Sequence, residues 1–259
     1  MSKNKKPKFG LFITARVDSS RLPNKMLLPI RGKPVIEHDI VRAKQARNPD
    51  IIILCTTKRS KDDILVELAK KHGIEYYRGS LSDKLGRWLS AAKSFGLDYF
   101  VEYDGDDLFC DPELIDFAIK QVVKKHCDFL KVPGTLVCGG VGPCMSVPAL
   151  KKVCQIKATD DTETVWWNYF TDTGLFQVRD LEVKERVFHN PNIRLTLDYQ
   201  EDFDFFKKVF EELDIKVNKV PLRQILQFLN KRPELAKINF FRQQDFADNQ
   251  KKKTKLVLK

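Results

Sequence analysis

The chain lacks the glycine-rich motifs that mark two large classes of nucleotide-binding protein. Neither G-x-x-x-x-G-K-[ST], the phosphate-binding loop of P-loop NTPases, nor the dinucleotide fingerprint G-x-G-x-x-G occurs in the 259 residues. No Ser-His-Asp or Cys-His arrangement for nucleophilic catalysis is evident either. Any nucleotide chemistry therefore has to depend on other residues.

Cysteine patterns that bind metals and long apolar segments are also missing. The six cysteines form no C-x-x-C pair and have no zinc-ligand spacing to the four histidines, which argues against a zinc site. The first apolar run stops before Arg16, too early for a signal peptide, and no later run has the length of a membrane span. We therefore expect a cytoplasmic protein with reduced thiols and no membrane partner.

Acidic residues are absent from both ends of the chain. Nine lysines lie in residues 1–8 and 251–259, so only two of the eleven net positive charges remain for the rest of the sequence. We expect residues 1–8 and 246–259 to be disordered basic tails on a single domain of residues 9–245. That domain lacks the positive footprint of a nucleic-acid-binding surface, so we expect no nucleic-acid partner.

Hydrophobic patterns in the first 103 residues alternate between strand and helix. Continuous apolar runs indicate buried strands, and the amphipathic runs between them, two of which are closed by glycine, indicate helices. This alternation predicts an α/β fold with a doubly wound, mostly parallel sheet. The expected strands are residues 9–14, 51–57, 74–77 and 98–103, and the expected helices are residues 35–46, 61–72 and 83–95.

The pattern after residue 126 is less regular. Residues 161–170 contain four aromatic side chains and are compatible with either a helix or an extended segment. Aromatics at this density suit an interface between subunits, but an intramolecular core explains them equally well. The further strands expected here are residues 127–132, 193–198 and 215–220, and the further helices are residues 146–156 and 201–213.

The first strand leads into a loop that carries three cations. Arg16, Arg21 and Lys25 lie within ten residues of one another, and Pro23 braces the loop. Because like charges repel, a loop that gathers them is suited to an anion such as a triphosphate. A solvated basic loop without a ligand is the alternative.

Polar residues follow the other strands at the same edge of the predicted sheet, where ligands of such sheets bind. Thr57 and Arg78 follow the second and third strands, and residues 104–107 contribute three carboxylates after the fourth. Carboxylates opposite a triphosphate-binding loop suit Mg²⁺, which prefers oxygen ligands from one or two acids, phosphates and water. An acidic turn that only precedes the helix starting at Asp111-Pro112 is the alternative.

Two motifs resemble those of the sugar-acid cytidylyltransferases. The first is A-R-x-x-S-[ST]-R-L-P-x-K at residues 15–25, and the second is R-L-T-[LI]-D at residues 194–198, followed by Glu201 and Asp202 at a helix start. The sequence looks most like the branch typified by spore-coat polysaccharide biosynthesis enzymes, with the enzymes that activate KDO and neuraminic acid as more distant relatives. The resemblance covers residues 9 to about 240. It implies a Rossmann-like nucleotidyltransferase fold with an inserted dimerisation arm at about residues 135–190, and hence a homodimer.

The resemblance also implies a reaction and a set of site residues. Such an enzyme transfers CMP from CTP to an acidic sugar or a related hydroxyl or phosphate acceptor, with Mg²⁺ as cofactor, in the biosynthesis of surface polysaccharide or glycoconjugate. In the family, the equivalents of Arg16, Arg21 and Lys25 hold the CTP phosphates. The expected catalytic residues are Arg16, Lys25, Asp106 and Asp198, with Asp106 and Asp198 as metal ligands, and the expected nucleotide-binding residues are Ala15, Arg16, Ser20, Arg21, Lys25, Thr57, Arg78, Arg87 and Asp106.

The sequence departs from the family pattern at three places. Asn24 replaces a usual glycine, which predicts a different path of the loop backbone. Glu102 stands where close relatives often have arginine, and Asp107-Leu108 replaces a residue followed by proline. Two alternative functions therefore stay open: a non-catalytic relative that binds a nucleotide or a sugar, and a basic interaction protein that acts through its lysine tails.

Overall fold

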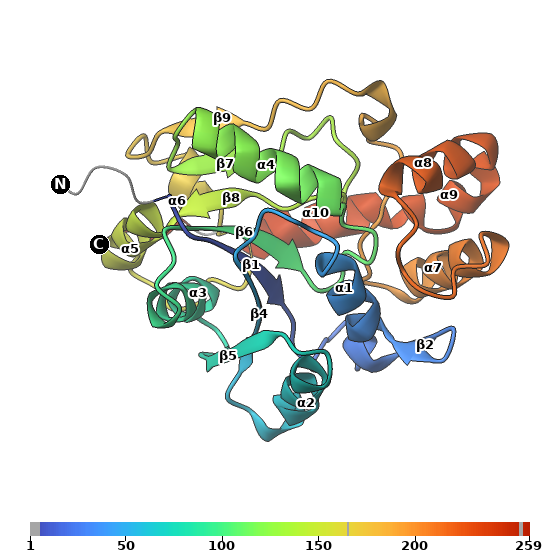
Figure 1. The fold of residues 1–259 in the computed structure, drawn as a ribbon, viewed down its shortest axis with the longest axis horizontal. Helices are drawn as coiled ribbons and strands as arrows, with labels where there is room; N and C mark the ends of the chain where they lie inside the picture. Colours follow the sequence, from blue (N-terminus) through green and yellow to red (C-terminus); the bar gives the residue numbers. More distant parts are fainter. Residues whose placement is uncertain (1–5, 165, 254–255) are drawn as a thin grey trace.

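The computed structural model describes residues 6–164, 166–253 and 256–259. Its centre is a sheet of seven strands in the order β5-β4-β1-β6-β8-β7-β9 (Figure 1). The pairs formed by β1, β4, β5 and β6 are parallel, whereas β8 runs antiparallel to both β6 and β7. The strands are β1 (Phe9–Thr14), β4 (Ile51–Thr57), β5 (Glu75–Gly79), β6 (Tyr99–Asp104), β7 (Phe129–Lys131), β8 (Cys144–Ser146) and β9 (Val178–Asp180), and β2 (Pro29–Ile30) pairs with β3 (Lys33–Pro34) in a separate hairpin.

The α/β alternation predicted for the first 103 residues is confirmed, because a helix follows each of β1, β4 and β5 along the chain. Proline within the first helical turn and an aspartate or serine N-cap start α4 and α5, as the sequence suggests. The helices are α1 (Val35–Ala43), α2 (Asp63–Lys71), α3 (Lys84–Ser94), α4 (Pro112–Lys124), α5 (Val147–Ile156), α6 (Asn168–Thr171), α7 (Gln200–Glu212), α8 (Leu222–Lys231), α9 (Pro233–Phe240) and α10 (Arg242–Lys253).

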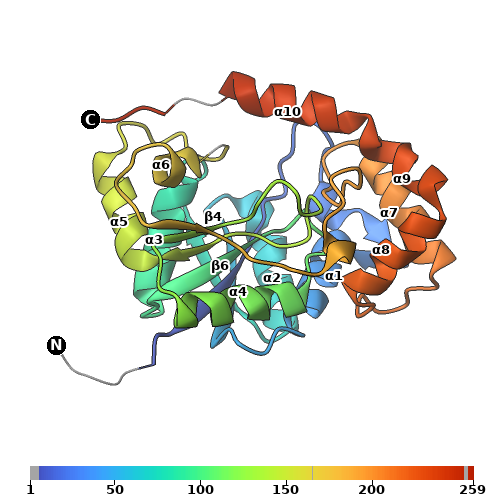
Figure 2. The ribbon, with the colours of Figure 1, turned by 90° about the horizontal axis from the view of Figure 1, so that it is seen from above.

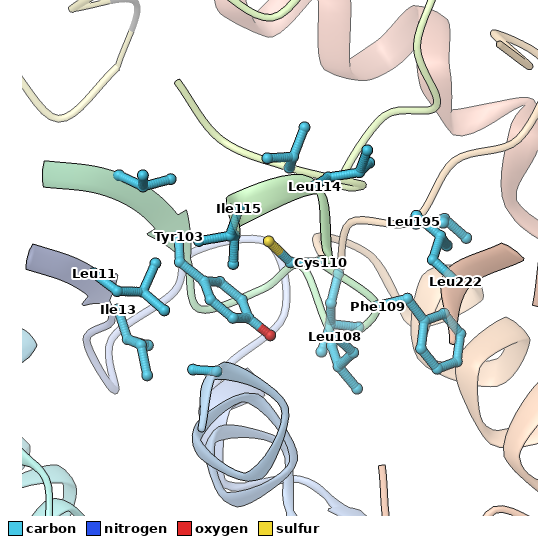
Figure 3. Packing of buried hydrophobic residues seen from close by; sticks show 14 of the residues in the cluster. Leu11, Ile13, Tyr103, Leu108, Phe109, Cys110, Leu114, Ile115, Leu195 and Leu222 are labelled. Atoms are coloured by element: carbon cyan, nitrogen blue, oxygen red, sulfur yellow. The ribbon is translucent and has the colours of Figure 1, made fainter. Parts of the chain in front are cut away.

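Alternate residues of each central strand belong to different cores. Leu11 and Ile13 of β1 pack on the side of α1, α4 and α7, whereas Phe12 packs on the side of α3, α5 and α6. Figure 3 shows the first side, with Tyr103 of β6 beside Leu11 and Ile13. Because a strand places successive side chains on opposite faces, burial of all three residues requires helices on both faces. The doubly wound architecture is therefore what these apolar runs predict.

Two expected strands are wrong. Residues 193–198 are extended and buried but form only a single bridge, between Arg194 and Cys138, and residues 215–220 form no strand. In the second segment the buried Asn218 amide instead donates to the carbonyl of Leu108 (2.7 Å). All of residues 193–198 are buried, and in residues 215–220 only Ile215 and Asn218 are. This burial arises from packing against helices and loops rather than from a neighbouring strand.

The aromatic segment and the rest of residues 135–190 are integrated into the domain. Trp166 is 4% exposed and makes edge contacts with Trp88 of α3 and Phe129 of β7, while Phe170 stacks on Phe129. The strands β8 and β9 of the expected dimerisation arm lie within the central sheet. The intramolecular alternative therefore accounts for most of these aromatics, and Trp167, at 37% exposed, is the exception in this set.

The C-terminal tail also differs from expectation. Helix α10 covers most of the segment expected to be disordered, and Figure 2 shows it on the opposite side of the molecule from α4. Near the very end, Leu258 forms an antiparallel bridge with Lys157. In the N-terminal tail, Lys8 Nζ donates to the carbonyl of Phe95 (2.9 Å), and residues 1–5 lie outside the described part. No helix among the described residues is long and apolar enough to cross a membrane.

Candidate active site

A polar cleft of about 230 Å³ opens where β1 and β6 end, and the basic loop lines it. The structure brings most of the expected site residues together here, although they come from segments up to 183 residues apart in the sequence. The expected residues that line the cleft are Ala15, Arg16, Ser20, Arg21, Lys25, Arg87, Asp106 and Asp198.

Thr57 and Arg78 are not among the residues that line this cleft. The Thr57 hydroxyl hydrogen-bonds to Asp62, and the Arg78 guanidinium donates to the carbonyls of Thr57 (2.9 Å) and Arg59 (2.8 Å). Arg78 also pairs with Asp63 of α2 (2.7 Å). These contacts brace the loop after β4.

Short contacts to neighbouring elements fix the basic loop. The Val17 amide donates to the buried Asp62 carboxylate (2.8 Å), and the apolar side chains of Val17 and Leu22 are buried in the core. Asn24 has φ 56° and ψ 25°, a left-handed conformation that glycine adopts freely and asparagine tolerates better than most residues. The asparagine therefore permits the backbone conformation that a glycine would favour at this position.

Lys25 joins the two expected metal ligands. Its Nζ donates to Asp106 Oδ2 (2.5 Å), to Asp198 Oδ1 (3.1 Å) and to the carbonyl of Leu197 (2.7 Å). Burial opposes the charge on this lysine, but the two carboxylates outweigh burial and raise the pKa of Lys25 above its usual value. Lys25 is thus an ammonium ion held between two acids at the floor of the cleft.

Asp198 reaches the cleft through cationic partners on both sides. Besides Lys25, Arg21 pairs with Asp198 Oδ1, and the buried Arg194 donates to Asp198 Oδ2 (2.8 Å). Burial would raise the pKa of Asp198, yet Lys25, Arg21 and Arg194 together hold it well below its usual range. Asp198 is therefore a stable carboxylate.

Asp202 fixes the backbone that carries Asp198. One of its carboxylate oxygens accepts from the amides of Asp198 and Tyr199 (both 2.9 Å), and the other accepts from Arg194 Nε (3.0 Å). Its position in the first turn of α7 agrees with the expected helix-start role. Through Arg194 it also orients the site.

The surroundings of Asp106 shift its pKa in the opposite direction from that of Asp198. Burial raises its pKa, Lys25 lowers it, and the neighbouring charges of Asp198 and Asp104 raise it again, so that the net shift is upward. Both Asp106 and Asp198 nevertheless reach one ammonium group, so the two carboxylates lie close enough to share a cation. Among the described residues no three His, Cys, Asp or Glu side chains surround a common point, so phosphates and water would supply the other ligands of Mg²⁺, as is usual for this ion.

A second charged group beside the basic loop was missed from the sequence. Arg16 (3.3 Å) and Arg87 (2.9 Å) both pair with Glu163, and Lys84 Nζ donates to Asp104 Oδ1 (2.8 Å). Lys84 and Glu163 line the cleft. In sequence Lys84 looks like an ordinary first-turn residue of an amphipathic helix, and only the structure shows that it contacts Asp104 at the end of β6.

Comparisons with known proteins agree with this geometry. Residues 11–237 match the sequence profile of the family described as Cytidylyltransferase. Two relatives are an uncharacterized protein, MJ1063, from Methanocaldococcus jannaschii (32% identity; 88% of this chain, 92% of the relative) and the spore coat polysaccharide biosynthesis protein SpsF from Bacillus subtilis (27% identity; 86% and 95%). A cytidylyltransferase structure from Leptospira borgpetersenii shares the fold, with a TM-score of 0.82 at 24% identity over 89% of this chain and 97% of that one.

The profile spans nearly the whole sheet and both motifs that carry the resemblance, and the cleft brings the residues of those motifs together. The chain therefore belongs to the cytidylyltransferase family and is a CTP-dependent nucleotidyltransferase.

Proposed function

We propose that this protein transfers CMP from CTP to a hydroxyl- or phosphate-bearing acceptor in the biosynthesis of a surface polysaccharide or glycoconjugate. The observation that carries the proposal is the convergence of Arg16, Arg21 and Lys25 with Asp106 and Asp198 in one cleft. In the reaction, an acceptor oxygen forms a bond to the α-phosphorus of CTP, and the bond to the β-phosphate oxygen breaks. Pyrophosphate leaves with the bonding electrons, and the proton of a hydroxyl acceptor passes to solvent.

Such a transfer depends on positioning and on charge neutralisation more than on a protein nucleophile. Arg16 and Arg21 are partly exposed and can turn from Glu163 and Asp198 toward phosphate oxygens. Asp106 and Asp198 would hold Mg²⁺, which neutralises phosphate charge when bound. Arg194 and Asp202 keep Asp198 in place while its other partners change.

Nucleotide selectivity tests this proposal directly. We expect CTP with Mg²⁺ to raise the melting temperature, because a ligand that binds only the native state stabilises it by mass action. ATP and GTP at the same concentration should have a much smaller effect in differential scanning fluorimetry. Equal shifts in melting temperature with all three nucleotides would show that the site binds nucleoside triphosphates in general.

The departures at Asn24, Glu102 and Asp107 suggested a non-catalytic relative, but the family match supports the enzyme. Pyrophosphate release from CTP, Mg²⁺ and a panel of acceptors separates the two functions, since a binding protein releases none. Most of the aromatics that suggested a subunit interface pack inside the chain. The homodimer therefore remains a prediction from the family resemblance.

Helix α10 gives a second test, because it contributes Phe246 to the cleft wall. The Phe246 ring lies 4.8 Å from the Arg194 guanidinium carbon, and Gln243 accepts from Arg194 Nη1 (3.2 Å). Since a cation–π contact contributes about 0.5–2 kcal/mol, Phe246→Ala should weaken CTP binding roughly two- to thirtyfold through a looser Arg194.

Phe241→Ala is the matched control, because Phe241 is 57% exposed and is not among the residues that line the cleft. Calorimetric titration of both variants with CTP measures the difference. Equal affinities in the two variants would show that α10 only packs beside the site.

A further inference from the structure

Tyr199 directly follows Asp198 and lies at the start of α7, beside the cleft but not among the residues that line it. Its ring is close to three guanidinium groups, because the ring centroid lies 4.9 Å from the Cζ of Arg242, 5.4 Å from that of Arg21 and 6.0 Å from that of Arg194. A guanidinium within about 6 Å of an aromatic ring is attracted by the negative face of that ring. One ring therefore joins the basic loop, the buried support of Asp198 and helix α10.

The two contacts that the structure gives the Arg21 guanidinium among the described residues differ in kind. Arg21 pairs with Asp198 Oδ1, and it lies over the Tyr199 ring. The ion pair has to break when Arg21 turns toward a nucleotide, because phosphate oxygens compete with the carboxylate for the same N–H donors. The ring contact uses no hydrogen-bond acceptor, so it can persist while the guanidinium binds an anion.

A support of this kind matters because of the length of the Arg21 side chain. The side chain is 27% exposed, so once it leaves Asp198 it can extend into solvent. Holding a long, partly exposed side chain in one conformation costs rotamer entropy, and this cost reduces the affinity for a ligand. A ring that already restricts the guanidinium removes part of that cost before the nucleotide binds.

The ring itself is fixed from two directions. At its base, the Tyr199 amide donates to Asp202 Oδ2 (2.9 Å). On the side of α10, Arg242 donates to both carboxylate oxygens of Glu201 (2.8 and 3.1 Å) and to Asp245 Oδ2 (2.7 Å). Because such a two-pronged ion pair fixes the plane of a guanidinium, Arg242 is a fixed neighbour of the ring. The ring therefore offers a fixed surface to the side chain from the basic loop.

We propose that Tyr199 is a positioning residue for nucleotide binding: its ring keeps the Arg21 guanidinium at the cleft when Arg21 turns from Asp198 toward the phosphates of CTP. The inference rests on the proposed phosphate contact of Arg21, and the effect of Tyr199 passes through that arginine alone. Helix α10, which lies beyond the matched residues 11–237, contributes to the same effect through Arg242.

Removal of the ring should weaken the binding of CTP. We expect Tyr199→Leu to raise the Kd for CTP about three- to tenfold in calorimetric titration, because Arg21 loses one cation–π contact. Tyr199→Phe keeps an aromatic face and should bind CTP within about twofold of the wild type. Phe203→Leu is the matched control, since Phe203 lies on the same helix, with Lys207 Nζ 5.8 Å from its ring, and is not among the residues that line the cleft. The Kd of this control should equal that of the wild type.

A double-mutant cycle distinguishes positioning of Arg21 from a general structural role. In an Arg21→Ala background, Tyr199→Leu should cause no further loss of CTP affinity, because the group that the ring orients is already absent. Melting temperatures are measured on the same samples, and Tyr199→Met replaces Tyr199→Leu if the leucine variant does not fold.

The outcomes separate this inference from the function on which it rests. Wild-type affinity of Tyr199→Leu, equal losses in the two backgrounds, or a loss in Tyr199→Phe as large as in Tyr199→Leu would overturn the positioning role. Wild-type affinity of Arg21→Ala would overturn the phosphate contact of Arg21 and the positioning role with it. Absence of CTP binding by the wild type would refute the proposed function itself.

Discussion

A Lys25→Met variant is expected to lose about a hundredfold or more in CMP transfer and, in addition, to unfold at a clearly lower temperature without ligand. The loss of activity follows if Lys25 holds the triphosphate as proposed, because removing a preorganised group that stabilises the transition state typically costs about 10²–10³ in rate. The sequence alone predicts only this part, because a cation in a loop looks free to bind an anion.

The loss of stability follows from the structure. Lys25 Nζ lies between Asp106 and Asp198, both within hydrogen-bond distance, and little of its side chain is exposed. Removing one partner of a buried ion pair costs about 3–5 kcal/mol in the free energy of unfolding, because the remaining charge stays buried without compensation. Arg21 and Arg194 still pair with Asp198, so the cost should fall mainly on Asp106.

The double variant Lys25→Met/Asp106→Asn separates the two effects. It removes both charges of that pair, so its melting temperature should return toward the wild-type value, while CMP transfer stays lost. Thermal unfolding in EDTA and pyrophosphate release measure the two quantities. If Lys25→Met melts like the wild type, the lysine is not held by the acids in the free protein.

Much of this site could be predicted because strand ends fix where the backbone goes. Arg16 and Asp106 directly follow β1 and β6, which are neighbours in the parallel sheet, and the cleft opens between them. A strand end does not fix where a side chain points, however. Thr57 also ends a central strand, but its hydroxyl turns to Asp62, and Arg78 turns to the backbone of the same loop.

Other features depend on tertiary partners that local patterns do not contain. Asp198 reaches the cleft without belonging to the sheet, because Arg194 and Asp202 brace its segment from within the core. Helix α10 has the lysine content of a disordered tail, yet Arg242 pairs with Glu201 (2.8 Å) and Phe246 covers Arg194. A lysine-rich composition therefore predicts disorder only for a segment that has no such partner in the folded domain.

The two acids should respond in opposite ways when each is neutralised in the free protein. Asp198→Asn should lower the melting temperature, because Lys25, Arg21 and Arg194 would lose their common partner and remain buried or half-buried cations. Asp106→Asn should leave the melting temperature unchanged or raise it, because Lys25 keeps Asp198 and the Leu197 carbonyl as partners, and because burial and the neighbouring acids already raise the pKa of Asp106. From the sequence alone, mutual repulsion of the two acids would predict unchanged or higher stability for both variants.

The pH dependence of stability should differ between the Asp198 and Asp106 variants. Because the folded pKa of Asp198 is depressed, its stabilising contribution is present above its ordinary pKa of 3.8 and is lost as the pH falls through the folded pKa. The difference between wild type and Asp198→Asn should therefore be full at neutral pH and shrink in acid. For Asp106 the folded pKa is raised above 3.8, so its ionisation costs stability as the pH rises through that window, and any gain from Asp106→Asn should appear only above it.

Activity should nevertheless fall in both variants, because the Mg²⁺ that we propose these two carboxylates share would lose its site when either is removed. The double Asn variant should then be little worse than each single one, as for residues that act as a unit. Pyrophosphate release over a range of Mg²⁺ concentrations, beside melting curves in EDTA between pH 3 and pH 8, measures both predictions on the same proteins. Additive losses of activity, or a lower melting temperature for Asp106→Asn at neutral pH, would show that Asp106 has a structural role separate from the metal. A melting temperature for Asp198→Asn equal to that of the wild type would show that the three cations do not depend on this carboxylate.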